Sequence, residues 1–546
     1  MKRITILIAC TAGAVSCLAA NGTFTIDATR PIGQVSPLFA GLMTEEINHS
    51  YDGGLYAELV QNRAFLDDSN SPVHWTSVND DHSTASITLD SANVYNDQLT
   101  TSLRLNVAHA DKSHPAGVAN EGYWGIPVQP NAKYRATVLA RAEENFSGPV
   151  TVAIVSNDGQ TVYASEKIST LTASWKKFEV ALKTGKVAPT TKARLVISLD
   201  QPGTVWLGMV SLFPPTWNDQ PNGFRKDLMQ MMVDMHPKFL RFPGGNYLEG
   251  DVVETRFEWK KTLGPIEQRH GHPCPWGYRS TDGLGLLEFL LWCEDMKAEP
   301  LLAVYAGYSL KGMHVNPGSD LDPFVKEALE EIEYVTGDTN TTWGARRAQD
   351  GHPAPFKLRY VEIGNEDWFD KSGSYDARFT QFNDAIKAKY TQLKLISTIG
   401  YDQPSVGRVH SRTPDMMDEH YYMSTDEFAQ KSPDYAKNYD RKSPEVFVGE
   451  WAAHEVSPPR PWEEGSKKLP PTPTMKAAIG DALFMMAMER NSDLIKMQCY
   501  APMLVNVNPG ARQWRPDLIG YDALTAYGSP SYYAIKTFNE NMGDEI

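Results

Sequence analysis

Two glutamates occupy equivalent positions at the ends of two predicted strands. Residues 357–363 form a short run rich in Leu, Tyr, Val and Ile that ends in Gly364-Asn365-Glu366, and residues 444–448 form a second run that ends in Gly449-Glu450. β-prone runs of this length, bounded by Pro and Gly, are typical of buried strands. In a β/α barrel the carboxyl ends of the strands carry the chemistry. Two facing carboxylates are what glycoside hydrolysis needs, one as proton donor and one as nucleophile or base.

The alternative is that each glutamate is an ordinary surface residue at a strand end. For a single such glutamate that interpretation is favoured. For two glutamates in matching contexts the catalytic interpretation is favoured, with Glu366 and Glu450 as the pair.

The surrounding motifs resemble one family of glycosidases. Asn365-Glu366 and Glu450 are similar to the catalytic residues of clan A retaining glycosidases. The ordered set of four further motifs resembles the α-L-arabinofuranosidases of glycoside hydrolase family 51: Arg241-Phe-Pro-Gly-Gly-Asn246, Trp276-Gly-Tyr278, Thr281-Asp-Gly-Leu-Gly285 and His420-Tyr-Tyr422. The resemblance extends from about Phe39 to Tyr533 and is interrupted by one inserted region.

The resemblance implies roles for the predicted pair and one neighbour. Glu450 is the expected nucleophile and Glu366 the expected acid/base residue. Asn365 is expected to hydrogen-bond the 2-hydroxyl of the sugar, a contact that strengthens in the transition state. Strands four and seven of a barrel face each other, so we expect the two carboxyl groups within about 6 Å, as in a retaining enzyme.

Four further residues are predicted to contact the substrate or the catalytic pair. By resemblance, Glu45 hydrogen-bonds the bound arabinose, Tyr422 holds the nucleophile and His420 assists near the acid/base. Asn246 follows two glycines and can both donate to and accept from hydroxyls. Alternatives stay open: Glu45 as a solvent-facing residue, and His420 as an ordinary core histidine.

Alternating strands and helices predict the fold class, an α/β (β/α)8 TIM barrel. The first βα unit is expected within residues 21–65, with a helix over Gly54–Arg63. The remaining units are expected within residues 216–546, with strands two to eight near 238–242, 301–305, 357–363, 395–399, 416–422, 446–449 and 494–500.

Residues 66–215 follow a different pattern. Short alternating runs separated by turn residues predict an inserted antiparallel β-sandwich. It resembles the jelly-roll carbohydrate-binding modules that accompany such enzymes. Trp75, Tyr123, Trp124 and Trp175 are candidates for stacking sugar, with a role in the core or scaffold as the favoured alternative for each.

The two ends of the chain give separate predictions. Members of the family usually carry a C-terminal β-sandwich completed by the N-terminal strand. Since the sequence stops at Ile546 after a last predicted helix, that β-domain is expected to be missing and residues 22–36 to lack their partner.

Residues 1–20 read as a secretory signal peptide, with Lys2 and Arg3 before an apolar run. Lipid anchoring at Cys17 is an alternative, and the location is secreted or periplasmic.

The composition limits the classes of partner and cofactor that we expect the protein to bind. A formal net charge of -15 disfavours nucleic acid or an anionic membrane as a partner, and no membrane span is predicted. Cys274, Cys293 and Cys499 form neither a disulfide framework nor a zinc pattern. We predict no metal and no cofactor.

The sequence thus predicts an exo-acting, retaining α-L-arabinofuranosidase that acts on arabinan or arabinoxylan side chains. The family resemblance also implies a homo-oligomer. Alternatives are another clan A glycosidase, such as a β-xylosidase or an endoglucanase, and a non-catalytic carbohydrate-binding protein.

Overall fold

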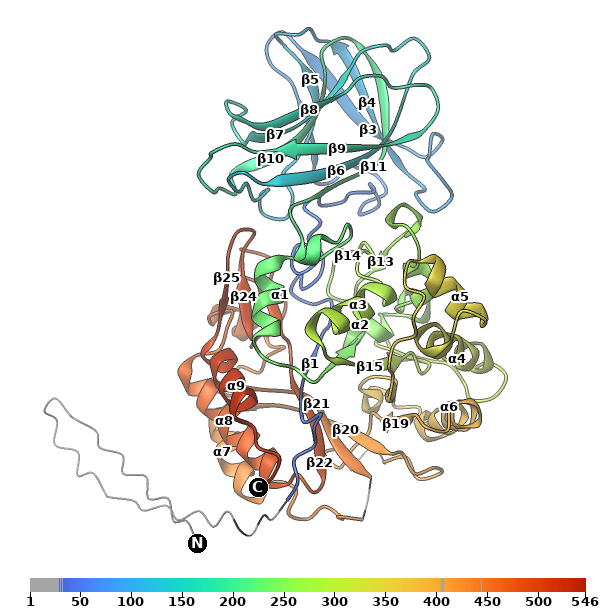
Figure 1. Cartoon of the computed structure of the whole chain (residues 1–546), viewed down its shortest axis with the longest axis vertical. Helices are drawn as coiled ribbons and strands as arrows, with labels where there is room; N and C mark the ends of the chain where they lie inside the picture. The colour runs from blue at the N-terminus through green and yellow to red at the C-terminus, as the bar shows by residue number, and fades with distance from the viewer. Residues whose placement is uncertain (1–28, 30, 32, 404–406, 443) are drawn as a thin grey trace, which may run out of the picture.

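A closed barrel forms the larger part of the chain (Figure 1). The computed structural model describes residues 29, 31, 33–403, 407–442 and 444–546. Eight parallel strands pair in chain order, and the last pairs with the first. They are β1 (Ala40–Met43), β12 (Phe239–Phe242), β15 (Glu299–Val304), β18 (Tyr360–Ile363), β19 (Lys394–Ser397), β20 (Met416–Ser424), β21 (Glu445–His454) and β22 (Ile495–Tyr500). The predicted TIM barrel is therefore confirmed.

Helices connect most of the barrel strands: α1 (Lys226–Val233), α2 (Asn246–Glu249), α3 (Leu286–Met296), α4 (Asp322–Thr336), α5 (Thr342–Gln349), α6 (Tyr375–Lys389), α7 (Thr425–Lys431), α8 (Met475–Arg490) and α9 (Pro530–Asn541). The helix predicted over Gly54–Arg63 is wrong. Those residues form turns and extended chain, because their backbone is paired with the segment that returns from the inserted region: Leu59 N–H donates to Leu212 O and Ala57 N–H to Gly223 O.

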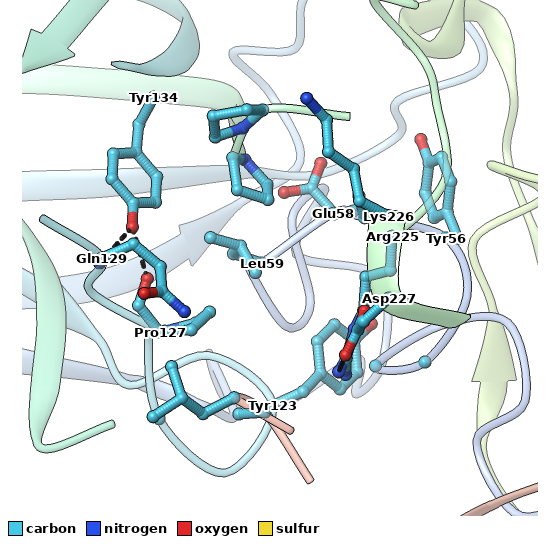
Figure 2. Close-up of a pocket in the computed structure, with 18 of the residues that line it drawn as sticks. Tyr56, Glu58, Leu59, Tyr123, Pro127, Gln129, Tyr134, Arg225, Lys226 and Asp227 are labelled. Carbon is cyan, nitrogen blue, oxygen red and sulfur yellow. Dashed lines mark hydrogen bonds and ion pairs between the residues drawn. The ribbon is translucent and has the colours of Figure 1, made fainter. Parts of the chain in front are cut away.

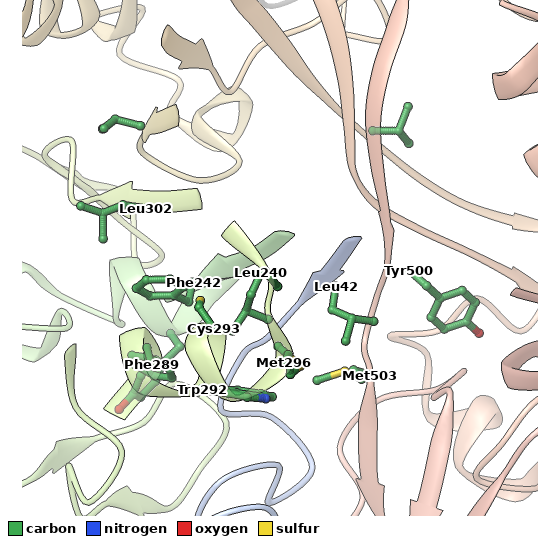
Figure 3. Packing of buried hydrophobic residues seen from close by; sticks show 14 of the residues in the cluster. Leu42, Leu240, Phe242, Phe289, Trp292, Cys293, Met296, Leu302, Tyr500 and Met503 are labelled. Carbon is green, nitrogen blue, oxygen red and sulfur yellow. The ribbon is translucent and has the colours of Figure 1, made fainter. Parts of the chain in front are cut away.

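Alternation along each barrel strand separates two environments. In β12, Leu240 and Phe242 pack outward against α3, where Figure 3 shows them beside Phe289 and Cys293. Phe239 belongs to the barrel interior. Arg241, which shares its parity, therefore also points inward, and it is fully buried.

A register shift between β20 and β21 changes the direction in which the later side chains of β21 point. In its pairing with β20, Phe447 is opposite Asp418 but Glu450 is opposite His420, so β21 carries one extra residue. Strict alternation from the inward-facing Phe447 would turn Glu450 away from the barrel axis. The bulge at Val448–Gly449 returns Glu450 to the inner side.

Residues 75–213 contain a second β-structure, drawn above the barrel in Figure 1. Two five-stranded antiparallel sheets face each other around an apolar core. One has the order β2 (Trp75–Val78), β5 (Ala116–Asn120), β10 (Ala193–Leu199), β7 (Val150–Ser156), β8 (Val162–Ile168). The other has the order β3 (Thr84–Asp90), β4 (Ser102–His109), β11 (Gly203–Phe213), β6 (Lys133–Ala142), β9 (Lys176–Lys183). We call this part the sandwich.

A buried ion pair lies where the sandwich joins the barrel. Glu58 accepts from Arg63 at 3.4 Å, from Leu212 N–H at 2.8 Å and from the Ser211 hydroxyl at 2.5 Å. Both Glu58 and Arg63 are buried. The junction is therefore a bonded interface, since buried charges are stable only when paired.

Beside this junction lies a cavity of about 310 Å³, whose labelled lining in Figure 2 includes Leu59, Pro127 and Tyr134. The cavity wall is mainly apolar, with Arg225, Lys226 and Asp227 at the α1 end. None of the seven residues predicted for the catalytic site lines it, whereas Tyr123, a candidate for stacking sugar, does.

The C-terminal part follows β22 with a small three-stranded sheet and α9. The sheet consists of β23 (Leu504–Asn506), β24 (Ile519–Tyr521) and β25 (Ala526–Gly528). After α9, the final residues pair with the N-terminal segment: Gly33 N–H donates to Ile546 O, and Val35 N–H to Asp544 O. The expectation that residues 22–36 lack a partner is therefore wrong for Gly33–Val35.

The predicted signal peptide and the alternative anchor at Cys17 lie outside the described residues. Within the described part of the chain, no helix combines the length and the apolar character needed to cross a lipid bilayer.

Candidate active site

The structure brings Glu366 and Glu450 together at the barrel mouth. Glu366 lies three residues beyond the end of β18, whereas Glu450 lies within β21, which continues to His454 and so does not end at Gly449-Glu450 as the sequence predicts. One oxygen of each carboxylate and one ring nitrogen of His420 lie within 4.8 Å of one another. The expectation of two close carboxyl groups is met. The side chain of Glu366 is 16% exposed and that of Glu450 is 6% exposed, so the pair faces a restricted opening.

Two donors hold the carboxylate of Glu450. Arg241 Nη1 donates to Oε1 at 2.9 Å, and the Tyr422 hydroxyl donates to Oε2 at 2.7 Å. One lone pair on each oxygen is thereby fixed, which orients the carboxylate while leaving its other lone pairs open. Tyr422 lies where the sequence predicts a residue that holds the nucleophile.

His420 links Glu366 to a second carboxylate. Its Nδ1 lies 2.8 Å from Glu366 Oε1, and its Nε2 lies 2.7 Å from Asp418 Oδ2. Both nitrogens face carboxylate oxygens, an arrangement that favours the imidazolium, the form in which both nitrogens donate. Burial opposes this charge, but Glu450, Asp418 and Glu366 together raise the pKa of His420 well above its ordinary value.

Asp418 is held in turn by groups that favour its ionised form. Gly449 N–H donates to Oδ1 at 2.7 Å, and Arg241 Nη2 lies 3.8 Å from Oδ2. Burial alone would raise the pKa of Asp418, but the charges of His420 and Arg241 lower it. A Cβ at Gly449 would meet Asp418 Oδ1 at 2.3 Å, so only glycine allows this approach.

The pKa of Glu366 is raised, mainly because the carboxyl is buried and also because Glu450 is negative, while His420 opposes the shift. A raised pKa keeps the proton that a general acid must deliver. The backbone of Glu366 is left-handed, with φ of 45°, a conformation that is uncommon for residues other than glycine.

Glu362 completes the charge network below the pair. Its carboxylate receives Arg241 Nε at 2.5 Å and Nη2 at 3.1 Å, and both residues have no exposed surface. Burial and the neighbouring Asp418 raise the pKa of Glu362 to about 8, although Arg241 opposes the shift. Glu362 and Asp418 therefore share a proton at neutral pH more readily than two separate carboxylates would.

Glu45 and Asn246 meet on the neighbouring strand ends. Glu45 Oε1 accepts from Asn246 N–H at 2.9 Å and from Trp276 Nε1 at 2.7 Å. Burial, together with the charges of Glu450 and Glu366, raises the pKa of Glu45 to about 8. A Cβ at Gly245 would meet the Glu45 carboxylate at 2.1 Å, and its φ of 61° also favours glycine.

Asn365 is oriented from both ends of its amide. Its Oδ1 accepts from Arg241 Nη2 at 2.8 Å, and its Nδ2 donates to Glu249 Oε2 at 2.9 Å. Glu249 Oε2 also accepts from Asn246 Nδ2 at 3.1 Å, so one carboxylate positions both asparagines. Its other oxygen, Oε1, is buried without a hydrogen-bond partner among the described residues.

All seven predicted site residues thus gather at one barrel mouth. Sequence reasoning gave no role to four residues of the network: Arg241, Glu249, Glu362 and Asp418. For two of these residues the sequence does offer an indication of a role. Glu362 interrupts an apolar strand, and Asp418 alternates onto the face of His420.

The spacing of Glu366, His420 and Glu450 would also suit a metal ion. The residues do not fit one in the protonation state described above. An imidazolium has no lone pair to offer a metal, so in that form His420 would not serve as a ligand.

A buried acid with a raised pKa, 4.8 Å or less from a carboxylate fixed by Arg and Tyr, is the machinery of acid-assisted cleavage at an acetal carbon. On a (β/α)8 barrel it defines a glycoside hydrolase.

Comparison with known proteins narrows this class. The model of the alpha-L-arabinofuranosidase 1 domain matches residues 231–441, and that of the alpha-L-arabinofuranosidase C-terminal domain matches residues 449–546. The probable alpha-L-arabinofuranosidase A of Aspergillus terreus is 38% identical over 524 residues, covering 94% of this chain and 78% of the relative. Alpha-L-arabinofuranosidase 1 of Arabidopsis thaliana is 36% identical over 535 residues, covering 95% and 74%. The chain belongs to the α-L-arabinofuranosidase family, glycoside hydrolase family 51.

A solved structure supports the same assignment. The arabinose-bound MgGH51 α-L-arabinofuranosidase superposes with a TM-score of 0.88 at 37% identity, covering 94% of this chain and 82% of that chain. The match to the C-terminal domain model corrects the expectation that this domain is missing. Its matched part begins within β21 and includes β22, the sheet of β23–β25 and α9.

Proposed function

We propose that the protein is a retaining, exo-acting α-L-arabinofuranosidase that removes terminal arabinofuranosyl groups from plant polysaccharides. Family membership supports the hydrolase activity and the sugar. The single observation that supports retention is that one oxygen of Glu366 and one oxygen of Glu450 lie within 4.8 Å of each other. Retaining enzymes space these groups by about 5–5.5 Å, whereas inverting enzymes leave about 6.5–9.5 Å for a water molecule.

In the first step Glu450 Oε attacks the anomeric carbon and forms a glycosyl ester, while the bond to the leaving oxygen breaks. Glu366 delivers its proton to that oxygen. In the second step Glu366 takes a proton from water, whose oxygen attacks the anomeric carbon and releases Glu450 as a carboxylate. Asn365, Asn246 and Glu45 are assigned to the hydroxyls of the bound sugar.

The imidazolium of His420 supports both steps. It lies 2.8 Å from Glu366 Oε1 and 3.4 Å from Glu450 Oε2, so it limits the repulsion between the two carboxylates. It also keeps the pKa of Glu366 from rising so far that the ionised form needed in the second step becomes inaccessible.

The direct test is hydrolysis of p-nitrophenyl α-L-arabinofuranoside beside the matching β-xyloside and β-glucoside. We expect turnover of the arabinofuranoside, with proton NMR showing that the first product keeps the α configuration. Preference for the β-xyloside or β-glucoside would replace the substrate assignment, and an inverted product would overturn the double displacement. Failure to turn over any glycoside would favour a binding protein.

We further propose that the sandwich is a jelly-roll module of the carbohydrate-binding type. Its support is architectural: two antiparallel five-stranded sheets around one apolar core. The aromatic candidates give it little support, because Trp75 and Tyr123 are buried and Trp124 Nε1 donates to Pro509 O of the barrel. Trp175 packs edge-on against Tyr95, with ring centroids 6.1 Å apart. Retention of the sandwich, expressed alone, on an arabinoxylan affinity gel would test the proposal.

Export and assembly remain predictions. Lys2, Arg3 and the apolar run that follows support secretion, which N-terminal sequencing of exported protein would test. The homo-oligomer expected from the family resemblance would be tested by light scattering.

A further inference from the structure

Two exposed aromatic side chains lie on the loops that follow Glu366 and the strand of Glu450 in the chain. Among the described residues, Phe369, Trp462, Tyr527 and Tyr533 are the aromatic side chains with large exposure, at 50%, 55%, 45% and 59%. Phe369 comes three residues after Glu366, and Trp462 is in the loop that follows β21, the strand of Glu450. Exposure by itself does not mark a binding surface, since single exposed apolar residues are common; the position of these two rings on the loops after Glu366 and β21 distinguishes them from Tyr527 and Tyr533.

Trp462 is the outer end of a series of ring contacts that starts at the nucleophile. Tyr422, which donates to Glu450, has its ring centroid 5.3 Å from that of Trp514. Trp514 lies 5.9 Å from Trp462 and 6.1 Å from Trp276, the donor to Glu45. Trp514 therefore connects the sugar-contacting residues of the site to an exposed ring.

The loop that carries Trp462 is held in place. Glu455, at its start, receives Thr474 N–H at 2.7 Å and forms an ion pair with Arg515 at 2.7 Å. Arg515 also donates to Thr472 O at 3.1 Å, and Arg512 donates to Leu469 O at 2.7 Å. These contacts close both ends of the loop, so Trp462 is presented at low entropic cost for binding.

Arg460 adds a polar group to the ring surface. Its guanidinium lies 5.6 Å from the ring centroid of Trp462. A cation beside a half-exposed indole combines an apolar surface with hydrogen-bond donors. That combination suits a sugar ring, which has C–H faces and hydroxyl edges.

Phe369 lies on the side of the leaving group. Glu366 must reach the glycosidic oxygen, so residues next to it border the departing part of the substrate. Trp368, between them, packs edge-on against His420 at 4.9 Å and is 5.9 Å from Phe369. The ring of Phe369 is thus linked to His420 through the ring of Trp368.

We propose that Phe369 and Trp462 are stacking platforms for the main-chain sugar rings of a neutral polysaccharide that bears the arabinofuranosyl group. The inference rests on the proposed function. It adds a second sugar-binding region to the site that binds the terminal arabinofuranosyl group. Neutrality is favoured because a protein with net charge -15 repels a polymer rich in uronic acids.

The test compares a polymer with a small substrate. Trp462→Ala, Phe369→Ala and the double variant are assayed on arabinoxylan and on p-nitrophenyl α-L-arabinofuranoside, with Tyr533→Ala on α9 as a control of equal exposure. We expect the ratio of kcat/KM on arabinoxylan to kcat/KM on the aryl glycoside to fall about fivefold in each single variant, through KM, since one aromatic contact is worth about 1 kcal/mol. Trp462→Phe should restore most of the ratio, and Tyr533→Ala should leave it unchanged.

The outcomes separate the two proposals. If the wild-type protein fails on both substrates, the proposed function is wrong. If the wild-type protein cleaves both and the ratio is unchanged in the three variants, the platform assignment is overturned while the function stands. An equal loss on both substrates, checked against the thermal midpoint, would assign the rings a structural role and also overturn the inference.

Discussion

The barrel mouth and the sandwich core use inward-facing strand positions in opposite ways. At the carboxyl ends of the barrel strands, Arg241, Glu362 and Asp418 point inward with no exposed surface. In the sandwich, equally buried inward positions such as Leu195 and Leu207 are apolar. The effective cost of burying an ion is several kcal/mol, so the barrel mouth is stable only because its charges pair. The sandwich core carries no such cost.

This contrast indicates a division of labour. The buried charges of the barrel fix the orientation and pKa of Glu366 and Glu450, at a cost in stability that neighbouring apolar contacts must offset. The sandwich adds an apolar core and contributes no side chain to the charge network. Substitutions in the two regions should therefore separate rate from stability.

The largest effect is expected from Glu450→Ala. Loss of the nucleophile should lower kcat on the aryl arabinofuranoside by about 10⁴-fold or more. Added azide should yield no product of retained configuration. Glu445→Ala, at the other end of the same strand and partly exposed, is the control and should keep wild-type kcat. A Glu450→Ala variant with near wild-type kcat would place the chemistry elsewhere.

Glu366→Ala should respond in the opposite way to azide. A dinitrophenyl leaving group departs without protonation, so the glycosyl ester should still form and then wait for a general base. Azide needs no deprotonation and should restore turnover by about tenfold to a hundredfold, with a glycosyl azide of retained configuration. Rescue in Glu450→Ala and not in Glu366→Ala, as judged by NMR of the product, would reverse the two roles.

Asp418→Asn should change the pH dependence more than the rate. Without the carboxylate the pKa of His420 falls, and a ring that is charged for less of the time lowers the pKa of Glu366 less. Activity requires protonated Glu366, so the alkaline limb of kcat/KM should move to higher pH, with a loss of about tenfold at the optimum. Asp415→Asn, near the start of β20, should leave the limb in place. A limb that stays or moves to lower pH in Asp418→Asn would contradict the link through His420.

The smallest effect on rate is expected in the sandwich. Leu195→Ala in β10 should lower the free energy of unfolding by about 2–5 kcal/mol, because it leaves a cavity in a fully buried core. The kcat/KM on the aryl glycoside should remain within about twofold of wild type, since no sandwich side chain bonds to the carboxylate pair. Denaturant titration and steady-state kinetics on the same preparation would check both statements. A large loss of rate in the folded variant would mean that the sandwich shapes the active site.

Much of this arrangement can be predicted from local patterns. Apolar runs followed by Gly-Asn-Glu or Gly-Glu locate β18 and the start of β21, because period-two burial is a local property. The end of β21 is predicted wrongly: Gly449 lies inside the strand, which continues to His454. The family resemblance added Glu45, Asn246, His420 and Tyr422, and the structure places all four at the same mouth as the glutamates. The roles of these residues stay predictions until variants are assayed.

The remaining features depend on contacts between distant segments. The bulge that re-aims Glu450 is set by the register between β20 and β21, which the sequence of β21 alone does not fix. Glu249 acts on Asn365 across 116 positions. The segment Gly54–Arg63 has helical periodicity, but pairing with Leu212 and Gly223 overrides that local preference.

The same paired segment has a consequence for folding order. Strands β1 and β12 are paired in the barrel. Met43 ends β1 and Phe239 begins β12, and the whole sandwich lies between these two residues in the sequence. Closing an unstructured loop of roughly 200 residues costs about 0.6 kcal/mol more for each doubling of its length. Once the sandwich has folded, the hydrogen bond from Leu59 N–H to Leu212 O brings its two ends together, so the remaining loop is only about a quarter as long and its closure costs roughly 1 kcal/mol less. We therefore expect the sandwich to acquire hydrogen-exchange protection before the β1–β12 pair, with barrel closure waiting on a domain that takes no part in the chemistry.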